Sequence, residues 1–245
     1  MTLFEILRTS AIPVFPVLHG RAHGDLRRLI RSIDAAKPLS MLDVGGRSSP
    51  YSTGLNARIT LMDLPRESEV QEHLKLGFNE RILEQVQRRR SNIDRVLIED
   101  MCKTTLPDAG FDIAAAVEVL EHVPDDRAFL HQMARVLKPG GWAYLTTPNG
   151  EWVKHDPENN PDHLRHYTRE WLAGLLEECF DEVHVVYGIK TGKHRWRGLR
   201  SFDFKSPGQL AVTMGSNLIN HWESRNLDEV PQRTANLIAW ARKNS

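Results

Sequence analysis

Residues 39–51, Leu-Ser-Met-Leu-Asp-Val-Gly-Gly-Arg-Ser-Ser-Pro-Tyr, decide the fold that this sequence predicts. The apolar run over 39–44 predicts a buried strand, and Gly45-Gly46 with the turn-forming residues after it predicts a tight turn at the strand's end. Glycine suits such a turn because it tolerates a positive φ and lets a ligand approach the backbone closely. Two-glycine turns are common in proteins, so the later strands have to show whether this turn binds a ligand.

Further strands are predicted over 58–63, 95–100, 111–117, 142–147 and 183–187, and apolar residues at helical spacing predict helices over 25–36, 126–137 and 170–176. The strands over 58–63 and 95–100 end in Asp63 and Asp100. In a βαβ nucleotide-binding unit, an acid at the end of the second strand accepts hydrogen bonds from a ribose diol. The pattern predicts an α/β fold with a doubly wound, mostly parallel, Rossmann-like sheet, helices on both faces, and helical additions at both ends of the chain.

Two motifs complete the pattern, namely Glu-Val-Leu-Glu-His-Val over 118–123 and Leu-Lys-Pro-Gly-Gly over 137–141. With the glycine turn, they make the sequence similar to the class I S-adenosylmethionine-dependent methyltransferases, in particular the small-molecule, methyltransferase type 11-like branch. The resemblance covers residues 38–187 and implies S-adenosyl-L-methionine as the cofactor. It divides the chain into an N-terminal helical segment or lid over 1–37, the cofactor-binding methyltransferase domain over 38–187, and a C-terminal extension over 188–245.

The extension over 188–245 departs most from the family. Leu210, Met214, Leu218 and Trp222 recur every four residues, which predicts a helix where the family has its seventh strand. Leu237, Ile238 and Trp240 suggest a second helix. We expect these helices to pack on the methyltransferase domain, where they could cover the acceptor site or form a homodimer interface.

The resemblance assigns cofactor contacts to residues that follow strand ends. It implies that the glycine turn holds the methionine part of the cofactor, that Asp63 binds the ribose with Leu64 under the purine, that Asp100 and the Met101 amide read the adenine, and that Glu118 positions the methionine end. The expected cofactor-binding residues are therefore Asp43, Gly45, Gly46, Arg47, Asp63, Leu64, Asp100, Met101 and Glu118.

Arg47 is a departure from the family turn D-x-G-x-G, because it occupies the position of the second spaced glycine. Ser49-Pro50-Tyr51 matches a related subgroup, which supports the alignment. Arg47 could form an ion pair with the carboxylate of the cofactor, or it could block the site. The second alternative would make the chain a non-catalytic, cofactor-binding scaffold.

The candidate catalytic residues are His122 and His163, which are expected at the same edge of the sheet. A neutral imidazole near pH 7 is suited to taking the proton of a hydroxyl group, so each is a candidate general base. With Glu118 and Glu121 the two histidines would also suit a divalent cation. The same glutamate and histidine motif occurs in relatives not known to need a metal, so a base is favoured over a metal and no metal ligand is assigned. A purely structural role of the two histidines is the remaining alternative.

The acceptor is expected to be a small hydroxylated metabolite or sugar, methylated on oxygen. The alternative is an RNA ribose 2′-O-methyltransferase with a divalent metal, because Asp-His-x-x-x-x-Thr-Arg-Glu over 162–170 resembles the magnesium-dependent enzymes that act on small-RNA 3′ ends. The chain has 32 Lys and Arg and 32 Asp and Glu, which argues against nucleic acid as a partner. Basic residues around Trp196 form a local patch, for which a solvated loop is favoured over contact with bases or phosphate.

The cysteines and the N-terminal residues predict a protein of a reducing compartment. Cys102 and Cys179 lie far apart without a C-x-x-C spacing, so neither a disulfide framework nor a zinc finger is predicted. Charged residues and prolines interrupt the apolar N terminus, and no apolar run is long enough to cross a membrane. We therefore expect a cytoplasmic protein that is not inserted into a membrane.

Overall fold

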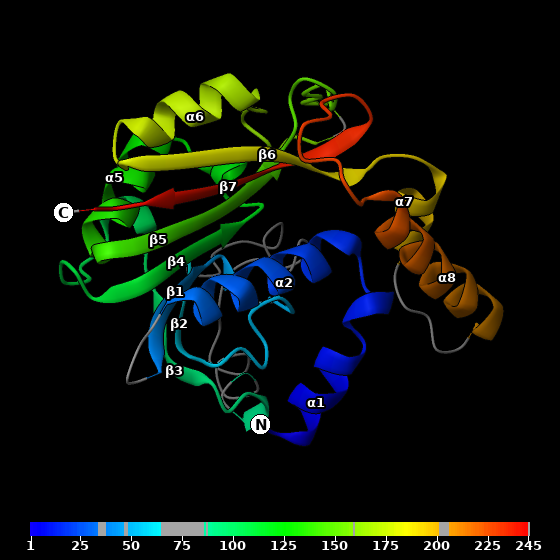
Figure 1. Cartoon of the computed structure of the whole chain (residues 1–245), viewed down its shortest axis with the longest axis horizontal. Helices are drawn as coiled ribbons and strands as arrows, with labels where there is room; N and C mark the ends of the chain where they lie inside the picture. Colours follow the sequence, from blue (N-terminus) through cyan, green and yellow to red (C-terminus); the bar gives the residue numbers. More distant parts are fainter. Residues whose placement is uncertain are drawn as a thin grey trace.

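The structure, a computed structural model, describes residues 1–33, 38–46, 49–64, 86, 88–158, 160–200 and 206–244. A seven-stranded sheet with the order β3-β2-β1-β4-β5-β7-β6 runs through these residues (Figure 1). Its strands are β1 (Leu39–Val44), β2 (Ala57–Asp63), β3 (Ile93–Ile98), β4 (Phe111–Val117), β5 (Leu137–Pro148), β6 (Glu182–Lys190) and β7 (Thr234–Arg242).

The sheet confirms the predicted α/β fold. β1 pairs in parallel with β2 and β4, β2 with β3, and β4 with β5, whereas β7 runs antiparallel to both β5 and β6. The chain first builds the sheet outward from β1 to β3 and then crosses back to place β4 on the other side of β1. In open α/β sheets, ligands bind beyond the carboxyl ends of the strands at this reversal.

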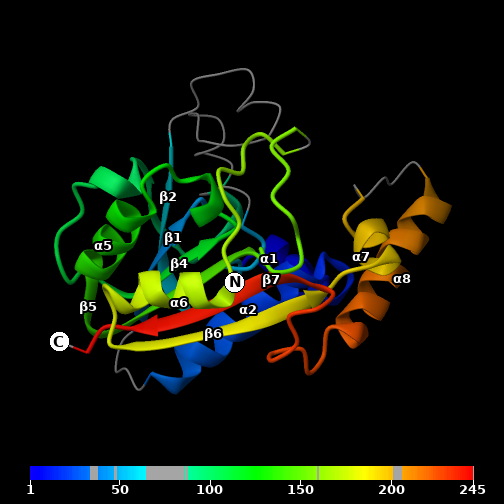
Figure 2. The same cartoon turned by 90° about the horizontal axis from the view of Figure 1, so that it is seen from above.

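Helices cover both faces of the sheet (Figure 2). α5 (Asp126–Val136) and α6 (Arg169–Glu177) pack on one face, and α2 (Val17–Ser32) packs on the other. Successive strand residues point to opposite faces, so each central strand supplies both cores. Leu42, Ala114 and Leu145 face α5 and α6, and their neighbours Met41, Ile113 and Tyr144 face α2. Both layers are apolar, as a largely parallel sheet requires.

The helix starts on the α5 and α6 side lie where the sequence predicts them. The Asp125 carboxylate accepts a hydrogen bond of 2.9 Å from the Ala128 amide, and the Thr168 hydroxyl accepts one of 3.1 Å from the Trp171 amide. Each caps the first turn of its helix. α5 ends at Val136, so the segment 137–141 belongs to the irregular start of β5.

The prediction of a second C-terminal helix is wrong, because Leu237, Ile238 and Trp240 belong to β7. Leu237 and Ala239 pack into the α5 and α6 core, whereas Ile238 and Trp240 pack on the α2 side. A strand that is buried on both faces lacks the apolar and polar alternation that identifies a half-exposed strand. The extension expected over 188–245 therefore contributes a strand to the sheet in addition to α7 (Lys193–Gly198) and α8 (Pro207–Glu223).

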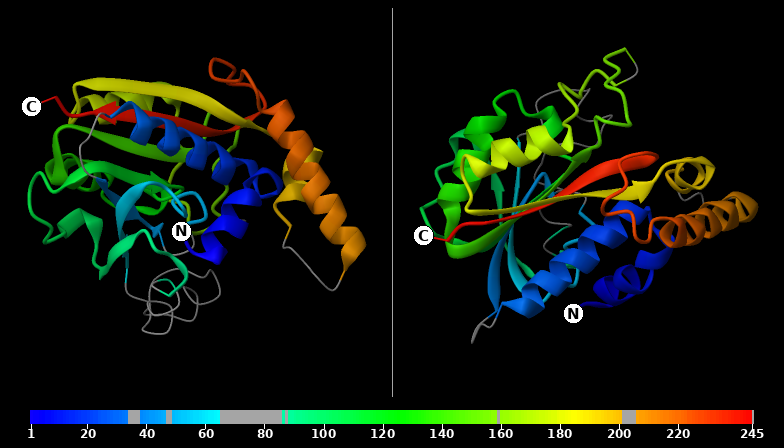
Figure 3. Two further views of the ribbon diagram at one scale, coloured as in Figure 1. Left: turned by 60° about the horizontal axis from the view of Figure 1, so that its bottom comes forward. Right: turned by 45° about the horizontal axis from the view of Figure 1, so that its top comes forward.

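The N-terminal residues form α1 (Leu3–Ser10), the 3₁₀ turn η1 (Ile12–Val14) and α2. The Glu5 carboxylate anchors α1 by accepting hydrogen bonds from the Ser91 amide at 2.8 Å and the Ser91 hydroxyl at 2.7 Å. α8 packs against η1 and lies at the end of the molecule that is farther from α5, as the two views of Figure 3 show.

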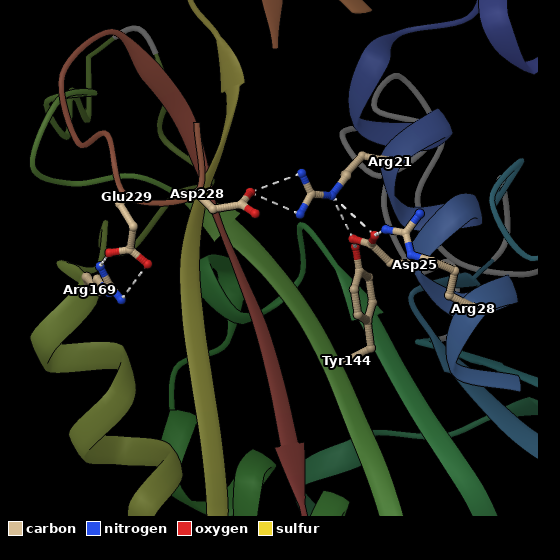
Figure 4. A network of polar contacts seen from close by, with 7 residues as sticks. All are labelled: Arg21, Asp25, Arg28, Tyr144, Arg169, Asp228 and Glu229. Carbon is tan, nitrogen blue, oxygen red and sulfur yellow. Dashed lines mark hydrogen bonds and ion pairs between the residues drawn. The ribbon is translucent and has the colours of Figure 1, made fainter. Parts of the chain in front are cut away.

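A network of charged side chains joins α2 to the segment that precedes β7 (Figure 4). Asp25, which is fully buried, accepts hydrogen bonds from Arg21 at 2.9 Å and from the Tyr144 hydroxyl at 3.1 Å, and it pairs with Arg28. Arg21 also contacts Asp228 at 3.2 Å. On the other face of the sheet, α6 is tied to the same segment by the pair formed by Arg169 and Glu229.

Candidate active site

The glycine turn after β1 keeps the backbone open at the reversal of the sheet. Gly45 has φ +72°, and an added Cβ would lie 2.6 Å from the Val119 side chain. A Cβ on Gly46 would lie 2.7 Å from the Asp43 carboxylate. Only glycine fits both positions without a shift of their neighbours. Gly45 is exposed, so its backbone can be approached by the methionine part of a cofactor.

Asp43 supports the turn from behind. Its carboxylate is fully buried and accepts hydrogen bonds from the Tyr51 hydroxyl at 2.8 Å and the Ser52 hydroxyl at 2.5 Å. Burial raises its pKa, an effect that these two donors and the charge of Arg90 oppose. Asp43 therefore holds the loop in place through Tyr51 and Ser52.

The next two strand ends also carry their acids to this edge. The Asp63 carboxylate accepts a hydrogen bond of 2.9 Å from the Leu64 amide, and Leu64 presents a side chain that is 45% exposed. Asp100 caps the 3₁₀ turn η3 (Met101–Lys103) by accepting a bond of 2.9 Å from the Cys102 amide. The Met101 side chain is buried in the core, which leaves only its backbone for a ligand. Arg47 lies outside the described residues.

Glu118 follows β4 in a left-handed conformation, with φ +55°. A positive φ in a residue other than glycine is strained and is often found at functional sites. Its carboxylate accepts hydrogen bonds from the Thr146 hydroxyl of β5 at 2.9 Å and from the Asn236 amide of β7 at 3.0 Å. Burial raises its pKa, and the Thr146 donor and the charge of Arg195 in α7 oppose that effect.

Two of these partners were not expected as site residues. Asn236 reaches Glu118 because β7 lies beside β5, a placement that the sequence did not predict. Its Oδ1 atom is buried and has no hydrogen-bond partner among the described residues. Arg195 was predicted only as one cation of a basic patch. No local sequence signal connects either residue with Glu118.

Glu121, His122 and His163 form a compact cluster beyond β4. Each can offer one ligand atom within 4.8 Å of the other two. The His122 Nε2 atom lies 4.0 Å from the Glu121 carboxylate, and the two imidazole rings meet edge to face with centroids 4.7 Å apart. The structure thus brings together the two candidate catalytic histidines.

The hydrogen bonds around the cluster determine which nitrogen of each imidazole carries the proton and which carries the lone pair. His122 Nδ1 lies 2.8 Å from the Asp162 carbonyl, to which it can only donate. His166 Nδ1 donates to the Val153 carbonyl at 2.8 Å, so its Nε2 accepts from His163 Nδ1, also at 2.8 Å. Among the residues that the structure describes, the Nε2 atoms of His122 and His163 consequently remain as acceptors. Burial, followed by the charges of neighbouring histidines, lowers the pKa of His163 to about 4.

Glu121 is the buried acid of this cluster. It is fully buried, and neither carboxylate oxygen has a hydrogen-bond partner among the described residues, although Thr147 is a polar neighbour. Burial and the charge of Glu118 raise its pKa well above the ordinary range. A carboxyl group in such a place is either protonated or, if ionised, has a cation beside it.

The strand order β3-β2-β1-β4-β5-β7-β6, with β7 antiparallel and a glycine turn after β1, is the Rossmann-like architecture of the class I methyltransferases. A family model described as a methyltransferase domain matches residues 18–186, and the chain belongs to this family. Its cofactor is S-adenosyl-L-methionine. The glycine turn, with its exposed Gly45 backbone, fits this cofactor.

Similar proteins come from several bacteria. The chain is 30% identical over 137 residues to a probable S-adenosylmethionine-dependent methyltransferase of Mycolicibacterium smegmatis, covering 55% of this chain and 51% of that protein. It is 48% identical over 144 residues to the 27-O-demethylrifamycin SV methyltransferase of Amycolatopsis mediterranei, covering 50% and 52%. It is 28% identical over 179 residues to the ubiquinone biosynthesis O-methyltransferase of Thiobacillus denitrificans, covering 65% and 73%. The chain thus spans about half the length of the first two of these relatives.

The fold also has solved counterparts. A crystal structure of an S-adenosylmethionine-dependent methyltransferase from Archaeoglobus fulgidus superposes with a TM-score of 0.57 at 16% identity, covering 92% of this chain and 94% of that one. Within the described residues, no helix is long and apolar enough to cross a membrane.

Proposed function

We propose that this protein transfers the methyl group of S-adenosyl-L-methionine to a hydroxyl oxygen of a small hydroxylated metabolite or sugar. The observation that carries the proposal is the pair of Nε2 lone pairs that His122 and His163 present beside Glu121. Methyl transfer to oxygen requires removal of one proton, and a neutral imidazole can accept it. When bound, the cofactor supplies a methyl group activated by its sulfonium, so the protein has to orient the acceptor, exclude water and take that proton.

The roles of the residues follow from their positions. In this proposal the turn at Gly45 and Gly46 takes the methionine part, Asp63 the ribose and Asp100 the adenine. Glu118, held by hydrogen bonds from β5 and β7, positions the methionine end. His122 or His163 would take the hydroxyl proton at Nε2. The second nitrogen of each ring is held by a carbonyl or by His166, which fixes the ring orientation.

Two relatives support oxygen as the acceptor atom. The names of the rifamycin and ubiquinone enzymes describe transfer to oxygen on small molecules.

The first experiment is calorimetric titration with S-adenosylhomocysteine, followed by a screen of hydroxylated acceptors with labelled cofactor. We expect micromolar binding, and we expect His122→Asn or His163→Asn to lower kcat at least a hundredfold while binding stays unchanged. His184→Asn is the matched control, because His184 is an exposed histidine of β6. Unchanged kcat in both site variants would contradict the role of the histidines. Binding by Arg47→Gly alone would instead favour the non-catalytic scaffold.

A second candidate uses the same residues to hold a divalent cation, and the unpartnered buried carboxylate of Glu121 favours it. Glu121, His122 and His163 supply one oxygen and two nitrogens, a set that suits a transition metal better than magnesium. A cation bound there would lower the pKa of an acceptor hydroxyl. An RNA ribose 2′-hydroxyl would then be an alternative acceptor.

Titration with Mn²⁺, Zn²⁺ or Mg²⁺ alone tests this candidate. We expect the wild type to bind a cation and Glu121→Gln to lose at least tenfold in affinity, because the amide keeps the shape of the side chain without its charge. Absence of binding by the wild type would leave the general base as the remaining mechanism. Retention on single-stranded RNA, dependent on the cation, would favour the RNA acceptor.

A further inference from the structure

The outward side of α8 is apolar and its inward side is polar, the reverse of an ordinary surface helix. Its buried side chains are Thr213, Ser216, Asn217 and Asn220. Its outward side carries four large apolar side chains with exposed fractions of 44–67%, namely Val212, Leu218, Ile219 and Trp222. Residues 207–222 contain no Asp, Glu, Lys or Arg.

The polar side of α8 is used within the molecule. The side-chain amide of Asn217 donates to the Val14 carbonyl of η1 at 2.8 Å and to the Gly198 carbonyl of α7 at 3.1 Å. The Asn220 amide donates to the Lys190 carbonyl at the end of β6 at 2.9 Å. These bonds satisfy backbone carbonyls at the ends of three elements. They also turn the apolar side of α8 away from the protein.

α1 shows the same inversion and packs against the same turn, η1. It buries the charged Glu5 and exposes Leu3, Ile6 and Leu7 by 72%, 49% and 62%. In Figure 1 α1 lies beneath α2, whereas α8 lies at the right-hand end of the molecule, and both helices contact η1. Outward apolar side chains on two helices that contact the same turn are more than the scattered exposure found on any protein surface.

The segment that contains α7 and α8 is also cationic. Residues 188–223, which reach the end of α8, hold six Lys and Arg and two acids, Asp203 and Glu223, in a chain whose total charges balance at 32 each. Lys193, Arg197 and Arg200 are exposed. So are the two apolar side chains among them, Trp196 by 67% and Leu199 by 47%. Apolar and aromatic side chains combined with Lys and Arg are typical of segments that lie in a membrane interface.

We propose that the α7–α8 segment docks on an anionic lipid surface, with Ile219 and Trp222 of α8 in the interfacial layer and Lys193 and Arg197 near lipid phosphates. Anionic lipid complements the cationic charge, whereas a contact between two α8 helices would bring two cationic segments together. Nucleic acid would use the cations but not the outward Val, Leu and Ile side chains.

Sedimentation with vesicles tests the proposal, using phosphatidylcholine alone and phosphatidylcholine with phosphatidylglycerol. We expect the full-length wild type to sediment only with the anionic vesicles, and added salt to weaken binding. The double variant Ile219→Ser/Trp222→Ser should bind at least tenfold more weakly, as should Lys193→Gln/Arg197→Gln. The controls are Trp171→Ser on α6, where Trp171 is 45% exposed, and Arg31→Gln at the end of α2. Both should bind as the wild type does.

Three results would overturn the proposal. The first is no binding to anionic vesicles, or binding that the α8 variant leaves unchanged. The second is a lipid-free dimer that Ile219→Ser/Trp222→Ser abolishes, which would assign the surface to a second copy. The third is binding to RNA, but not to vesicles, that only the Lys193 and Arg197 variant weakens. The lipid-docking proposal does not rest on the proposed function. Binding of S-adenosylhomocysteine by every variant would show that the variants fold, and it would separate loss of lipid binding from loss of the cofactor site.

Discussion

At the scale of single residues, Gly45 combines two constraints that can be separated. Its φ is +72° and a Cβ would meet Val119 at 2.6 Å, whereas Gly140 has φ +76° and nothing within 4 Å of that position. We expect Gly140→Ala to cost about 1–2 kcal/mol of stability without affecting ligand binding. Gly45→Ala should in addition lower the affinity for S-adenosylhomocysteine at least tenfold. Calorimetry and thermal melting measure both effects, and equal affinities would contradict a role for the turn.

His19 predicts a pH dependence of stability. Burial and the charge of Arg8 lower its pKa to about 4, whereas it titrates near 6.5 in an unfolded chain. The unfolded chain therefore takes up the proton first as the pH falls, so the stability is full above pH 6.5 and declines toward pH 4. We expect a contribution of about 2 kcal/mol to the loss between pH 7 and pH 5.

Urea unfolding at these two pH values measures the loss. His19→Gln should reduce the difference, and His184→Gln should leave it as in the wild type, since His184 is exposed. An unchanged difference in His19→Gln would show that His19 is not buried in this way.

The sequence could place residues of the site where each follows a strand end. Asp63 and Asp100 and the glycine turn come to one edge because parallel strands have their carboxyl ends together. Asn236 and Arg195 could not be placed, since their proximity to Glu118 depends on how a distant segment packs. The free nitrogens of His122 and His163 also depend on partners, the Asp162 carbonyl and His166, that only the folded loop supplies.

At the scale of elements, β7 is the strand whose position defines the C-terminal part. Leu237 is fully buried in the core shared with α5 and α6, whereas Leu218 of α8 is 50% exposed. We expect Leu237→Ala to lower the free energy of unfolding by about 2–5 kcal/mol and Leu218→Ala by less than about 0.5 kcal/mol. Denaturant titration distinguishes these values. A small effect for Leu237→Ala would mean that β7 is not part of the cooperative core.

The parallel strands were predictable because turn residues or a motif mark their ends, whereas β7 lacks such marks. The segments around β1, β4 and β5 are short apolar runs that end in turn residues or in the Glu118 motif, and such punctuation identifies buried strands. In β7 the run from Leu237 to Ala241 has no glycine or proline at either end. Its apolar residues face both cores, so their spacing resembles one turn of a buried helix. Only its pairing with β5 and β6 decides between the two.

At the scale of the whole molecule, the charged network of Figure 4 joins the layers on the two faces of the sheet. Asp25 is fully buried between Arg21, Arg28 and Tyr144, whereas the Glu229 side chain is 73% exposed in its pair with Arg169. We expect Asp25→Asn to cost about 1–3 kcal/mol, because the hydrogen bonds from Arg21 and Tyr144 lose a charged acceptor inside the protein. Glu229→Gln should cost less than about 1 kcal/mol. Equal losses in urea unfolding would contradict this difference.

The position of β7 also determines when the sheet can be completed during synthesis. β6 touches β5 only through β7, and residues 191–233 separate β6 from β7 in the chain. While the ribosome makes this interval, the parallel strands can pair but β5 keeps an open apolar edge, and β6 has no partner. Pairs that are distant in sequence form slowly, and open edges attract other chains. The nascent protein is therefore expected to depend on chaperones until residue 242 has left the ribosome.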